Sequence, residues 1–297
     1  ALDLGTNSCR MLIAQPKGAQ FHVIDSFAKS VQLGSGLEKT GKLSRDSMNR
    51  TIQALKVCKQ KLDKYDVKYS RLIATEACRR AKNSKDFILK VFQETDLKLN
   101  IIDTEEEARL AVISCAPLVS SKSEQLLVVD IGGGSTELVW IDLSAVPSHE
   151  RPKSIMRLHS GFHSIESPFP AARVVDWISV PLGVATLRDQ FNDVEDDAAR
   201  FALMSWYFEE KLTSPNHLKA RSASGVSFNN PITQVYCNSE KELSGRENFK
   251  ILLYCRPDAH ASRNLFELAL LGLDSFLSDS NKKVDYVVSG VGSSVSK

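Results

Sequence analysis

One local pattern occurs twice in this 297-residue chain, and it constrains the fold more than any other feature. The second copy, LLVVDIGGGSTELVW at Leu126–Trp140, is an apolar run that ends in Asp130, then three glycines and hydroxyl residues, then another apolar run. The first copy is ALDLGTNSCRMLIA at Ala1–Ala14, with Asp3 in the equivalent place. Two ordinary β-hairpins are the alternative, but their turns favour two residues such as Asn-Gly, whereas here a longer polar block follows an acid both times. The repeat predicts two related α/β domains.

The polar turn in each copy is suited to binding phosphate. Glycines let the backbone approach an anion and aim several N–H groups at it. An Asp at the end of the preceding strand is placed to hold a hydrated Mg²⁺ ion. We therefore expect one loop from each domain, the two facing each other across a cleft that holds one phosphorylated ligand.

The spacing of apolar residues predicts alternating strands and helices. The predicted strands are Leu2–Leu4, Cys9–Ala14, Phe21–Phe27, Arg71–Thr75, Asn100–Ile102, Leu126–Asp130, Glu137–Ile141, Asp176–Val180 and Val284–Val288. Three helices are predicted to begin at Ser44, Ser84 and Thr104, each of which can cap a helix N-terminus. Three further helices are predicted at Val184–Phe191, Ala198–Leu212 and Leu265–Leu277.

A polar stretch near Leu118–Glu124 indicates a domain boundary, which gives domains 1–120 and 121–297. The Pro- and Ser-rich stretch over 142–175 is expected to be irregular and to be an insertion. The C-terminal third could be an incomplete part of the second domain.

Composition narrows the class of protein. Hydrophobic residues make up 42% and charged residues 25%, as in soluble globular domains, and no apolar run reaches the roughly 18–20 residues that a membrane span needs. The six cysteines form no CxxC pair, which favours reduced thiols. We expect a cytoplasmic protein with no signal peptide, no membrane partner and no nucleic-acid partner.

The net charge of +2 is unevenly spread. The segment Lys39–Lys98 holds sixteen Lys and Arg against seven Asp and Glu, a balance of +9 that leaves −7 for the rest of the chain. A solvated basic face is one interpretation; a surface that attracts a polyanion is the other.

Several motifs together resemble the exopolyphosphatase/guanosine pentaphosphate phosphohydrolase (Ppx/GppA) family of the actin-like ATPase superfamily. They occur in the family's order over about the first two-thirds of the chain. They are ALDLGTNSCRMLIA, IATEACRRAKNSKDF at Ile73–Phe87, IIDTEEEARL at Ile101–Leu110, LVVDIGGGSTELV at Leu127–Val139 and VPLGVATLRDQF at Val180–Phe191. The resemblance implies an α/β fold of two RNase H-like (actin-like ATPase) domains with a phosphate-binding cleft between them.

The resemblance also implies roles for single residues. Glu107 is implied as the general base that activates a water, with Glu106 as the other candidate; alternatively, Glu107 completes a capping box with Thr104. Asp3, Asp130 and Glu137 are implied as ligands of Mg²⁺ or Mn²⁺. The implied phosphate-binding residues are Gly5, Asn7, Ser8, Thr75, Arg79, Gly132, Gly133, Gly134 and Ser135.

The activity implied is release of the terminal phosphate from inorganic polyphosphate or guanosine pentaphosphate by in-line attack of a water. The sequence does not distinguish these two substrates, since both end in the same phosphoanhydride. The alternatives are an actin-like or sugar-kinase-like ATPase that binds ATP between the same loops, and a non-catalytic sensor that kept them. A homodimer is compatible with each.

Overall fold

The structure is a computed structural model that describes residues 1–17, 20–159, 162, 171–213, 249–255 and 286–289. Contacts divide the chain into two compact units. The first unit is Ala1–Thr104 with Gly132–Gly134 and Gly183–Gln190; the second is Glu105–Ile131, Ser135–Leu182 and Phe191–Lys297. The predicted domain boundary between residues 120 and 121 stays a prediction.

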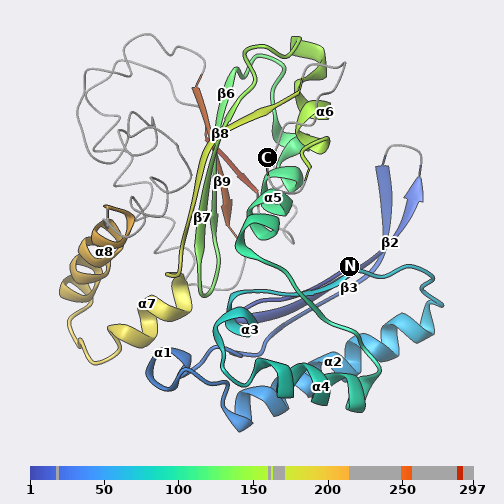
Figure 1. Ribbon diagram of the computed structural model, residues 1–297, viewed down its shortest axis with the longest axis vertical. Helices are drawn as coiled ribbons and strands as arrows, with labels where there is room; N and C mark the ends of the chain where they lie inside the picture. Colours follow the sequence, from blue (N-terminus) through green and yellow to red (C-terminus); the bar gives the residue numbers. More distant parts are fainter. Residues whose placement is uncertain (18–19, 160–161, 163–170, 214–248, 256–285, 290–297) are drawn as a thin grey trace. The chain divides into compact units, whose positions relative to one another are not determined.

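The first unit is built on a five-stranded sheet in the order β3-β2-β1-β4-β5 (Figure 1). β1 is antiparallel to β2 and parallel to β4, and β4 is parallel to β5. The strands are β1 (Leu2–Leu4), β2 (Ser8–Lys17), β3 (Gln20–Ser30), β4 (Leu72–Ala74) and β5 (Asn100–Ile101). The helices are α1 (Leu37–Thr40), α2 (Arg45–Lys64), α3 (Glu76–Arg80) and α4 (Ser84–Thr95).

The core of the first unit lies between the sheet and the helices α2 and α4. Leu2 and Leu4 of β1 are buried together with Ile52 and Leu55 of α2 and with Phe87 of α4. Because successive strand residues point to opposite faces, the side chain of Asp3 projects from the other face of β1. As predicted, Ser44 caps α2: its hydroxyl accepts a hydrogen bond of 3.1 Å from the N–H of Ser47.

The second unit contains a five-stranded sheet in the order β10-β9-β6-β7-β8. Counted from β8, this order repeats that of the first sheet: three consecutive antiparallel strands, then two parallel ones. Its strands are β6 (Gln125–Ile131), β7 (Thr136–Asp142), β8 (Arg173–Val180), β9 (Phe249–Cys255) and β10 (Tyr286–Ser289). The internal duplication predicted from the repeated loop is therefore present in the topology.

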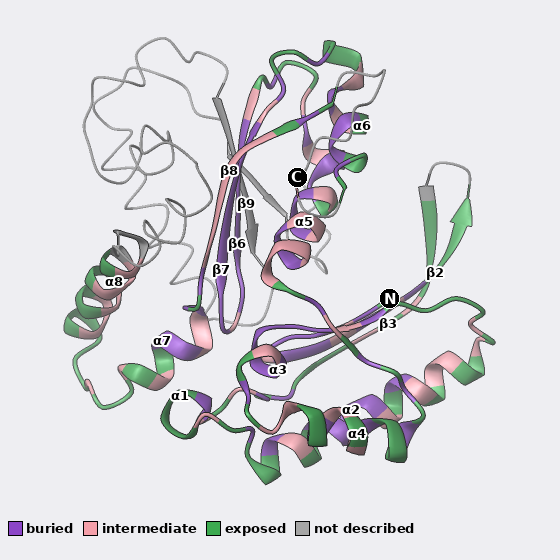
Figure 2. Cartoon of the chain, viewed as in Figure 1, coloured by how far each residue is buried: buried purple, intermediate pink, exposed green. Residues whose placement is uncertain are grey.

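Helix α5 (Thr104–Ser114) covers one face of this second sheet. Ala108 and Val112 of α5 share a buried cluster with Val128 of β6 and with Val139 of β7. Figure 2 shows β6 and β7 buried along most of their length. The remaining helices of the described part are η1 (Ala116–Leu118), η2 (Ser148–Glu150), α6 (Arg151–Met156), α7 (Val184–Gln190) and α8 (Asp197–Thr213).

Two sequence predictions need correction, and a third is untested. The stretch 142–175 is not irregular throughout, because it contains α6 and the start of β8, whose eight residues begin at Arg173 rather than Asp176. Asn83, not Ser84, precedes the first residue of α4, and its side chain bonds to the backbone of Leu43 instead. The predicted helix Leu265–Leu277 lies outside the described residues. Within the described residues, no helix is both long enough and apolar enough to cross a membrane.

Candidate functional site

The first polar loop, Gly5–Asn7, joins β1 to β2 and is fixed through its backbone. The N–H of Gly5 donates to the carbonyl of Ser8, and the carbonyl of Asn7 accepts from the N–H groups of Val31 and Gln32 at 2.8 and 2.9 Å. Thr6 and Ser8 are buried. The loop is therefore a defined turn held by the segment that follows β3.

The structure brings the glycine loop Gly132–Gly134 against this first loop. A Cβ added at Gly133 would lie 3.1 Å from the backbone nitrogen of Asn7, and one added at Gly134 would lie 2.4 Å from Oγ1 of Thr6. The buried Oγ1 of Thr6 has no hydrogen-bond partner among the described residues. Glycine is required at position 134 because no side chain fits beside Thr6.

Gly183 holds the glycine loop from another side. A Cβ at Gly183 would lie 2.5 Å from the carbonyl oxygen of Gly132, closer than real Cβ atoms come to backbone. The N–H groups of Val184 and Ala185, at the start of α7, donate to the carbonyls of Gly132 and Gly133 at 3.0 and 2.8 Å. Sequence reasoning assigned Gly183 no role, although it lies in the motif VPLGVATLRDQF that carried the family resemblance.

These contacts occupy the carbonyls of Gly132 and Gly133 and leave amides of the glycine loop available. Among the described residues, no hydrogen bond uses the N–H of Gly133 or Gly134 as a donor. Backbone N–H groups that converge in a tight turn form a concavity suited to an oxyanion. The phosphate-binding role of these glycines stays a prediction.

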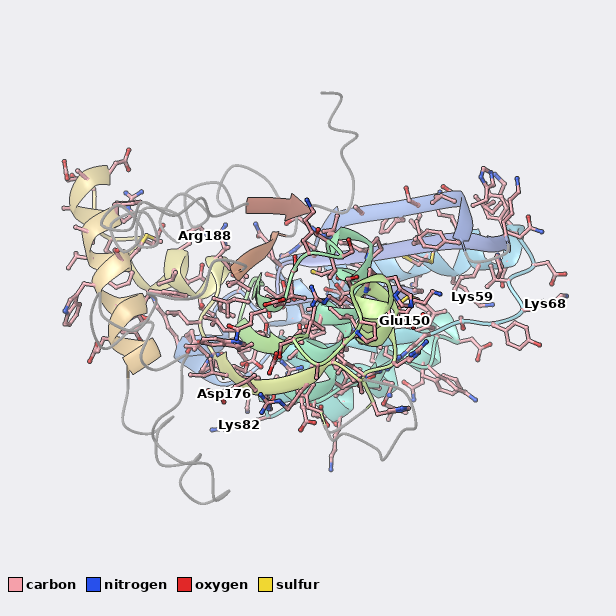
Figure 3. All side chains as sticks on the ribbon, turned by 90° about the horizontal axis from the view of Figure 1, so that it is seen from above. Lys59, Lys68, Lys82, Glu150, Asp176 and Arg188 are labelled. Atoms are coloured by element: carbon pink, nitrogen blue, oxygen red, sulfur yellow. The ribbon has the colours of Figure 1, made fainter. Side chains whose placement is uncertain are left out.

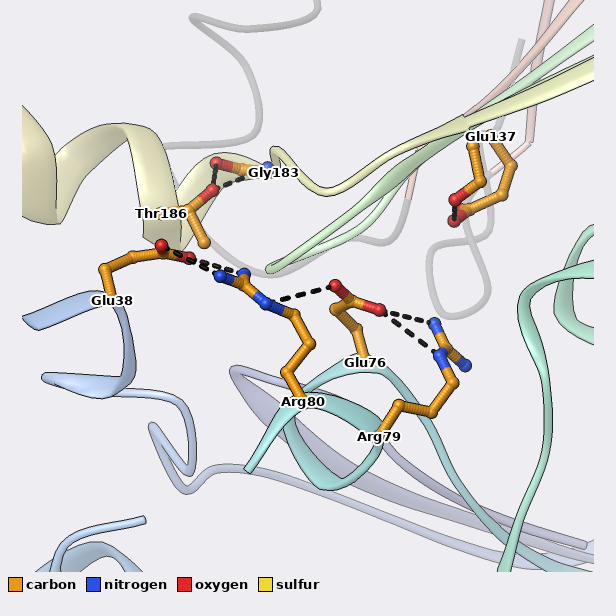
Figure 4. A network of polar contacts seen from close by, with 8 residues as sticks. Glu38, Glu76, Arg79, Arg80, Glu137, Gly183 and Thr186 are labelled. Atoms are coloured by element: carbon orange, nitrogen blue, oxygen red, sulfur yellow. Dashed lines mark hydrogen bonds and ion pairs between the residues drawn. The ribbon is translucent and has the colours of Figure 1, made fainter. Parts of the chain in front are cut away.

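Thr75 and Arg79 lie at the two ends of α3. Thr75 is buried at the N-cap, and its N–H donates to the carbonyl of Leu4 at 3.1 Å. Arg79 donates through Nε and Nη2 to Oε2 of Glu76, at 3.2 and 2.9 Å (Figure 4). Its Nη1 donates to the carbonyl of Ile102 at 2.9 Å. The guanidinium predicted to bind phosphate is thus paired with a carboxylate of its own helix.

Glu76 is a residue that sequence reasoning missed. Glu76 is buried, and a Cβ added at Gly134 would lie 3.2 Å from its Cγ. The second carboxylate oxygen of Glu76 lies 3.7 Å from Nε of Arg80. Arg80 in turn binds Glu38 (Figure 4). The spacing of Glu76 and Arg79, three residues apart on a helix, was the available signal.

The second unit gathers carboxylates on one face of its sheet. Asp130 of β6 is directly opposite Glu137 of β7, so their side chains share a face. Val128 lies two residues before Asp130, and Val139 lies two residues after Glu137, so both valines are on that same face, where they pack under α5. Because Glu107 belongs to α5, the fold places three acids together.

Electrostatics reveal this proximity at Glu137, which is only 1% exposed. Burial raises the pKa of Glu137 well above the usual value of a glutamate, and the negative charges of Glu107 and Asp130 raise it further. Hydrogen bonds from Ser135 and Ser179 act in the opposite direction. The pKa of Glu137 is raised because the site concentrates negative charge away from water.

Ser179 of β8 is a second missed residue. It is opposite Glu137 in the sheet, and its hydroxyl donates to Oε1 of Glu137 at 2.9 Å. Only the register of β8 on β7 reveals this contact. Oε2 of Glu137 is buried and has no hydrogen-bond partner among the described residues.

The two candidate bases differ in their surroundings. Glu106 binds Arg109 through two contacts of 2.6 and 2.8 Å, and Arg109 also donates to the carbonyl of Leu158. Glu107 is buried on the side of α5 that meets the sheet. Since α5 begins at Thr104, that residue lies inside the helix and not at the N-cap that a capping box with Glu107 requires.

The buried acids suit a hard divalent cation. Within the described part of the chain, Oε2 of Glu137 has no hydrogen-bond partner, and two neighbouring carboxylates oppose its charge. A cation would relieve this conflict. No group of three or more His, Cys, Asp or Glu in the described residues has the arrangement of a ready metal site. Mg²⁺ commonly binds through one or two carboxylates and keeps several waters, so the pair Asp130 and Glu137 fits this ion.

One family model matches most of the chain. The model of the Ppx/GppA phosphatase family matches residues 12–219. The bifunctional 3-dehydroquinate synthase/phosphatase of Fusobacterium nucleatum is 37% identical over 159 residues, which are 49% of this chain and 23% of that protein.

Solved structures show the same fold. The PPX-GPPA enzyme of Aquifex aeolicus is 25% identical, with a TM-score of 0.52 over 85% of this chain and 66% of that one. An exopolyphosphatase from Cytophaga hutchinsonii is 21% identical, with a TM-score of 0.59 over 85% of this chain and 65% of that one. The chain spans under a quarter of the length of its curated relative and about two-thirds of the length of these two structures.

Proposed function

The chain belongs to the Ppx/GppA phosphatase family, and from this premise we propose that it is a phosphohydrolase that releases the terminal phosphate of inorganic polyphosphate or guanosine pentaphosphate. The observation that carries the proposal is the set of buried acids Glu107, Asp130 and Glu137 on one face of the second sheet. Phosphoanhydride hydrolysis needs a carboxylate that orients water and further groups that offset the charge of the phosphates.

Glu107 is the general base in this proposal. Its carboxylate accepts a proton from the attacking water and holds that water for in-line attack on the terminal phosphorus. Glu106 is less suited to this role because Arg109 occupies both of its oxygens. Pairing with a cation makes a carboxylate a weaker proton acceptor.

The terminal phosphate binds, in this proposal, to the polar loops. The free N–H groups of Gly133 and Gly134 donate to its oxygens, together with the side chains of Asn7, Ser8 and Ser135. Arg79 exchanges its bonds to Glu76 for phosphate oxygens, which a planar guanidinium can grip through two bonds.

Asp3, Asp130 and Glu137 would hold the divalent cation. When bound, Mg²⁺ or Mn²⁺ offsets the negative charge of the phosphate oxygens. Ser179 keeps Glu137 oriented by donating to Oε1, which leaves Oε2 available.

A phosphate-release panel tests the proposal. Long-chain polyphosphate, tripolyphosphate, guanosine pentaphosphate and ATP are compared at equal concentrations of terminal phosphate. The proposal expects release from at least one of the first three at a rate well above that from ATP. The Asp130→Asn variant, assayed in parallel, excludes a contaminating phosphatase. Release from ATP alone would instead favour an actin-like or sugar-kinase-like ATPase.

A further inference from the structure

The basic segment Lys39–Lys98 divides into two classes of lysine in the structure. Several lysines are paired with acids: Lys56 with Glu94 at 2.8 Å, Lys59 with Asp63 at 2.6 Å, and Lys68 with Asp66 at 2.5 Å. Lys39, Lys42 and Lys82 are exposed, and none of these three forms an ion pair with an acid in the described part of the chain. The excess positive charge of the segment is therefore not spread evenly.

The unpaired lysines are brought together by a fixed backbone. The N–H of Lys82 donates to the carbonyl of Gly41 at 3.0 Å, and a Cβ at Gly41 would lie 3.4 Å from Cε and 3.7 Å from Nζ of Lys82. Lys42 follows Gly41 directly, and Lys39 lies two residues before it, in the last turn of α1. We refer to Lys39, Lys42 and Lys82 as the lysine cluster.

Two further contacts make this junction rigid. The side chain of Asn83 both accepts from the N–H of Leu43 at 2.8 Å and donates to the carbonyl of Leu43 at 3.0 Å. The hydroxyl of Thr40 binds the carbonyls of Gly36 and Lys42. The two segments that carry the three lysines are therefore held side by side. An anion stabilises positive charges that share one surface region, because like charges repel.

The lysine cluster lies one short helix away from the phosphate loops within the first unit. Helix α3 starts beside Thr75, next to Glu76 and the glycine loop, and it ends at Arg80, two residues before Lys82. Its five residues rise about 8 Å at roughly 1.5 Å each. The distance between the glycine loop and the cluster is therefore short enough for one linear polyanion to span.

The acid next to Lys39 in the sequence is already neutralised. Glu38, adjacent to Lys39, accepts two hydrogen bonds from Arg80, so its charge is offset. The cluster segments 39–43 and 82–83 contain no aromatic residue on which a base could stack. This composition suits a ligand made of phosphates alone better than a nucleotide.

We propose that Lys39, Lys42 and Lys82 form a second phosphate-binding site, where inner phosphates of a long linear polyphosphate bind while its terminal phosphate lies at the glycine loop. This inference rests on the function proposed above. The contacts are ionic and tolerate sliding of the chain. Ammonium groups are compact charges that bind phosphate without a fixed geometry.

The test compares two triple variants that change the net charge equally. The first is Lys39→Gln/Lys42→Gln/Lys82→Gln. The matched control is Lys56→Gln/Lys59→Gln/Lys68→Gln. Each of these three lysines is paired with an acid. Figure 3 shows Lys59 and Lys68 far from Lys82. KM is measured for long polyphosphate and for tripolyphosphate, and melting temperature confirms that both variants fold.

The quantity compared is the KM for long polyphosphate divided by the KM for tripolyphosphate. This ratio should rise about tenfold in the cluster variant and stay near the wild-type value in the control. The dependence of the long-chain KM on salt should also become weaker in the cluster variant only. An unchanged ratio in an active cluster variant, or an equal rise in both variants, overturns the inference and leaves the proposed function intact.

A wild-type protein that releases no phosphate from polyphosphate of any length or from guanosine pentaphosphate overturns the proposed function instead. In that event, anisotropy of fluorescently labelled long polyphosphate still decides the binding site. Equal affinity of the wild type and both variants for this probe overturns the inference. Weaker binding by the cluster variant alone supports it.

Discussion

At the scale of single residues, Glu137 shows how burial sets chemistry. Its carboxylate lies in a sheet, opposite Asp130 on one side and Ser179 on the other, with one oxygen bonded and the other without a hydrogen-bond partner in the described residues. Loss of water and two neighbouring charges raise its pKa. A proton or a metal ion is needed to relieve the repulsion.

The raised pKa of Glu137 predicts how stability depends on pH in metal-free protein. The folded state keeps a proton that the unfolded chain releases near its ordinary value of 4.5, so stability should fall as pH rises from there toward the raised pKa. Glu137→Gln removes this term, and its melting temperature in EDTA should therefore exceed that of the wild type by a margin that grows with pH. Melting curves from pH 4 to 8 measure the margin; one that shrinks with rising pH contradicts the assignment.

Glu107 carries the most direct prediction about turnover. Glu107→Gln keeps the size of the side chain but accepts no proton, so kcat should fall by about 10²–10⁴ with little change in melting temperature. If Glu107 is instead only a structural residue of α5, Glu107→Gln should keep the wild-type kcat.

Glu106→Gln is the matched variant for this experiment. It breaks the contacts to Arg109 and should lower the melting temperature while kcat stays within a few-fold of the wild type. The reverse pattern of kcat values would transfer the role of base from Glu107 to Glu106.

At the scale of elements, α7 acts as a support for the glycine loop. Its first N–H groups bind the carbonyls of Gly132 and Gly133, while Gly183 presses against the loop backbone. Thr186 closes the turn by accepting from the N–H of Gly183 at 2.7 Å. The conformation of the loop therefore depends on residues about fifty positions later in the chain.

Gly183→Ala should shift the loop, because the new methyl group meets backbone that cannot rotate away. We expect a loss of about 1–3 kcal/mol in stability and a rise in KM for polyphosphate. Gly36→Ala is the control: φ is +74° there and nothing lies within 4 Å, so it should lower the melting temperature through backbone strain alone and leave KM unchanged. Equal KM values for the two variants would argue against a supporting role for Gly183.

These elements also show what a single sequence can predict. The acid–glycine loops were recognisable because all of their residues are contiguous, and the strands β1, β6 and β7 were predicted from local apolar runs. The roles of Ser179 and Gly183 were not predictable, since they depend on the register of β8 and on a contact between distant segments. Arg79 was assigned to phosphate from its motif, while its pairing with Glu76 emerges only from the geometry of α3.

At the scale of the whole molecule, two sheets with one strand order carry one acid–glycine loop each. The proposed function requires Mg²⁺ or Mn²⁺, because the buried carboxylates and the phosphates are all negative. Phosphate release should fall to background in excess EDTA and return when either ion is added in excess. Full activity in EDTA would exclude Asp3, Asp130 and Glu137 as functional metal ligands.

Both loops leave the middle strand of a five-stranded sheet, β1 between β2 and β4, and β6 between β7 and β9. Amide hydrogens of a middle strand bond to one or other of its two neighbours and exchange slowly, whereas alternate amides of the outer strand β3 face away from the sheet. Deuterium uptake should therefore be slow up to Ile131 and rise abruptly at Gly133 and Gly134, whereas the bonded N–H of Gly5 should stay slow like those of β1. A bound phosphate would then appear as protection that extends the slow-exchanging strands a few residues further along the chain.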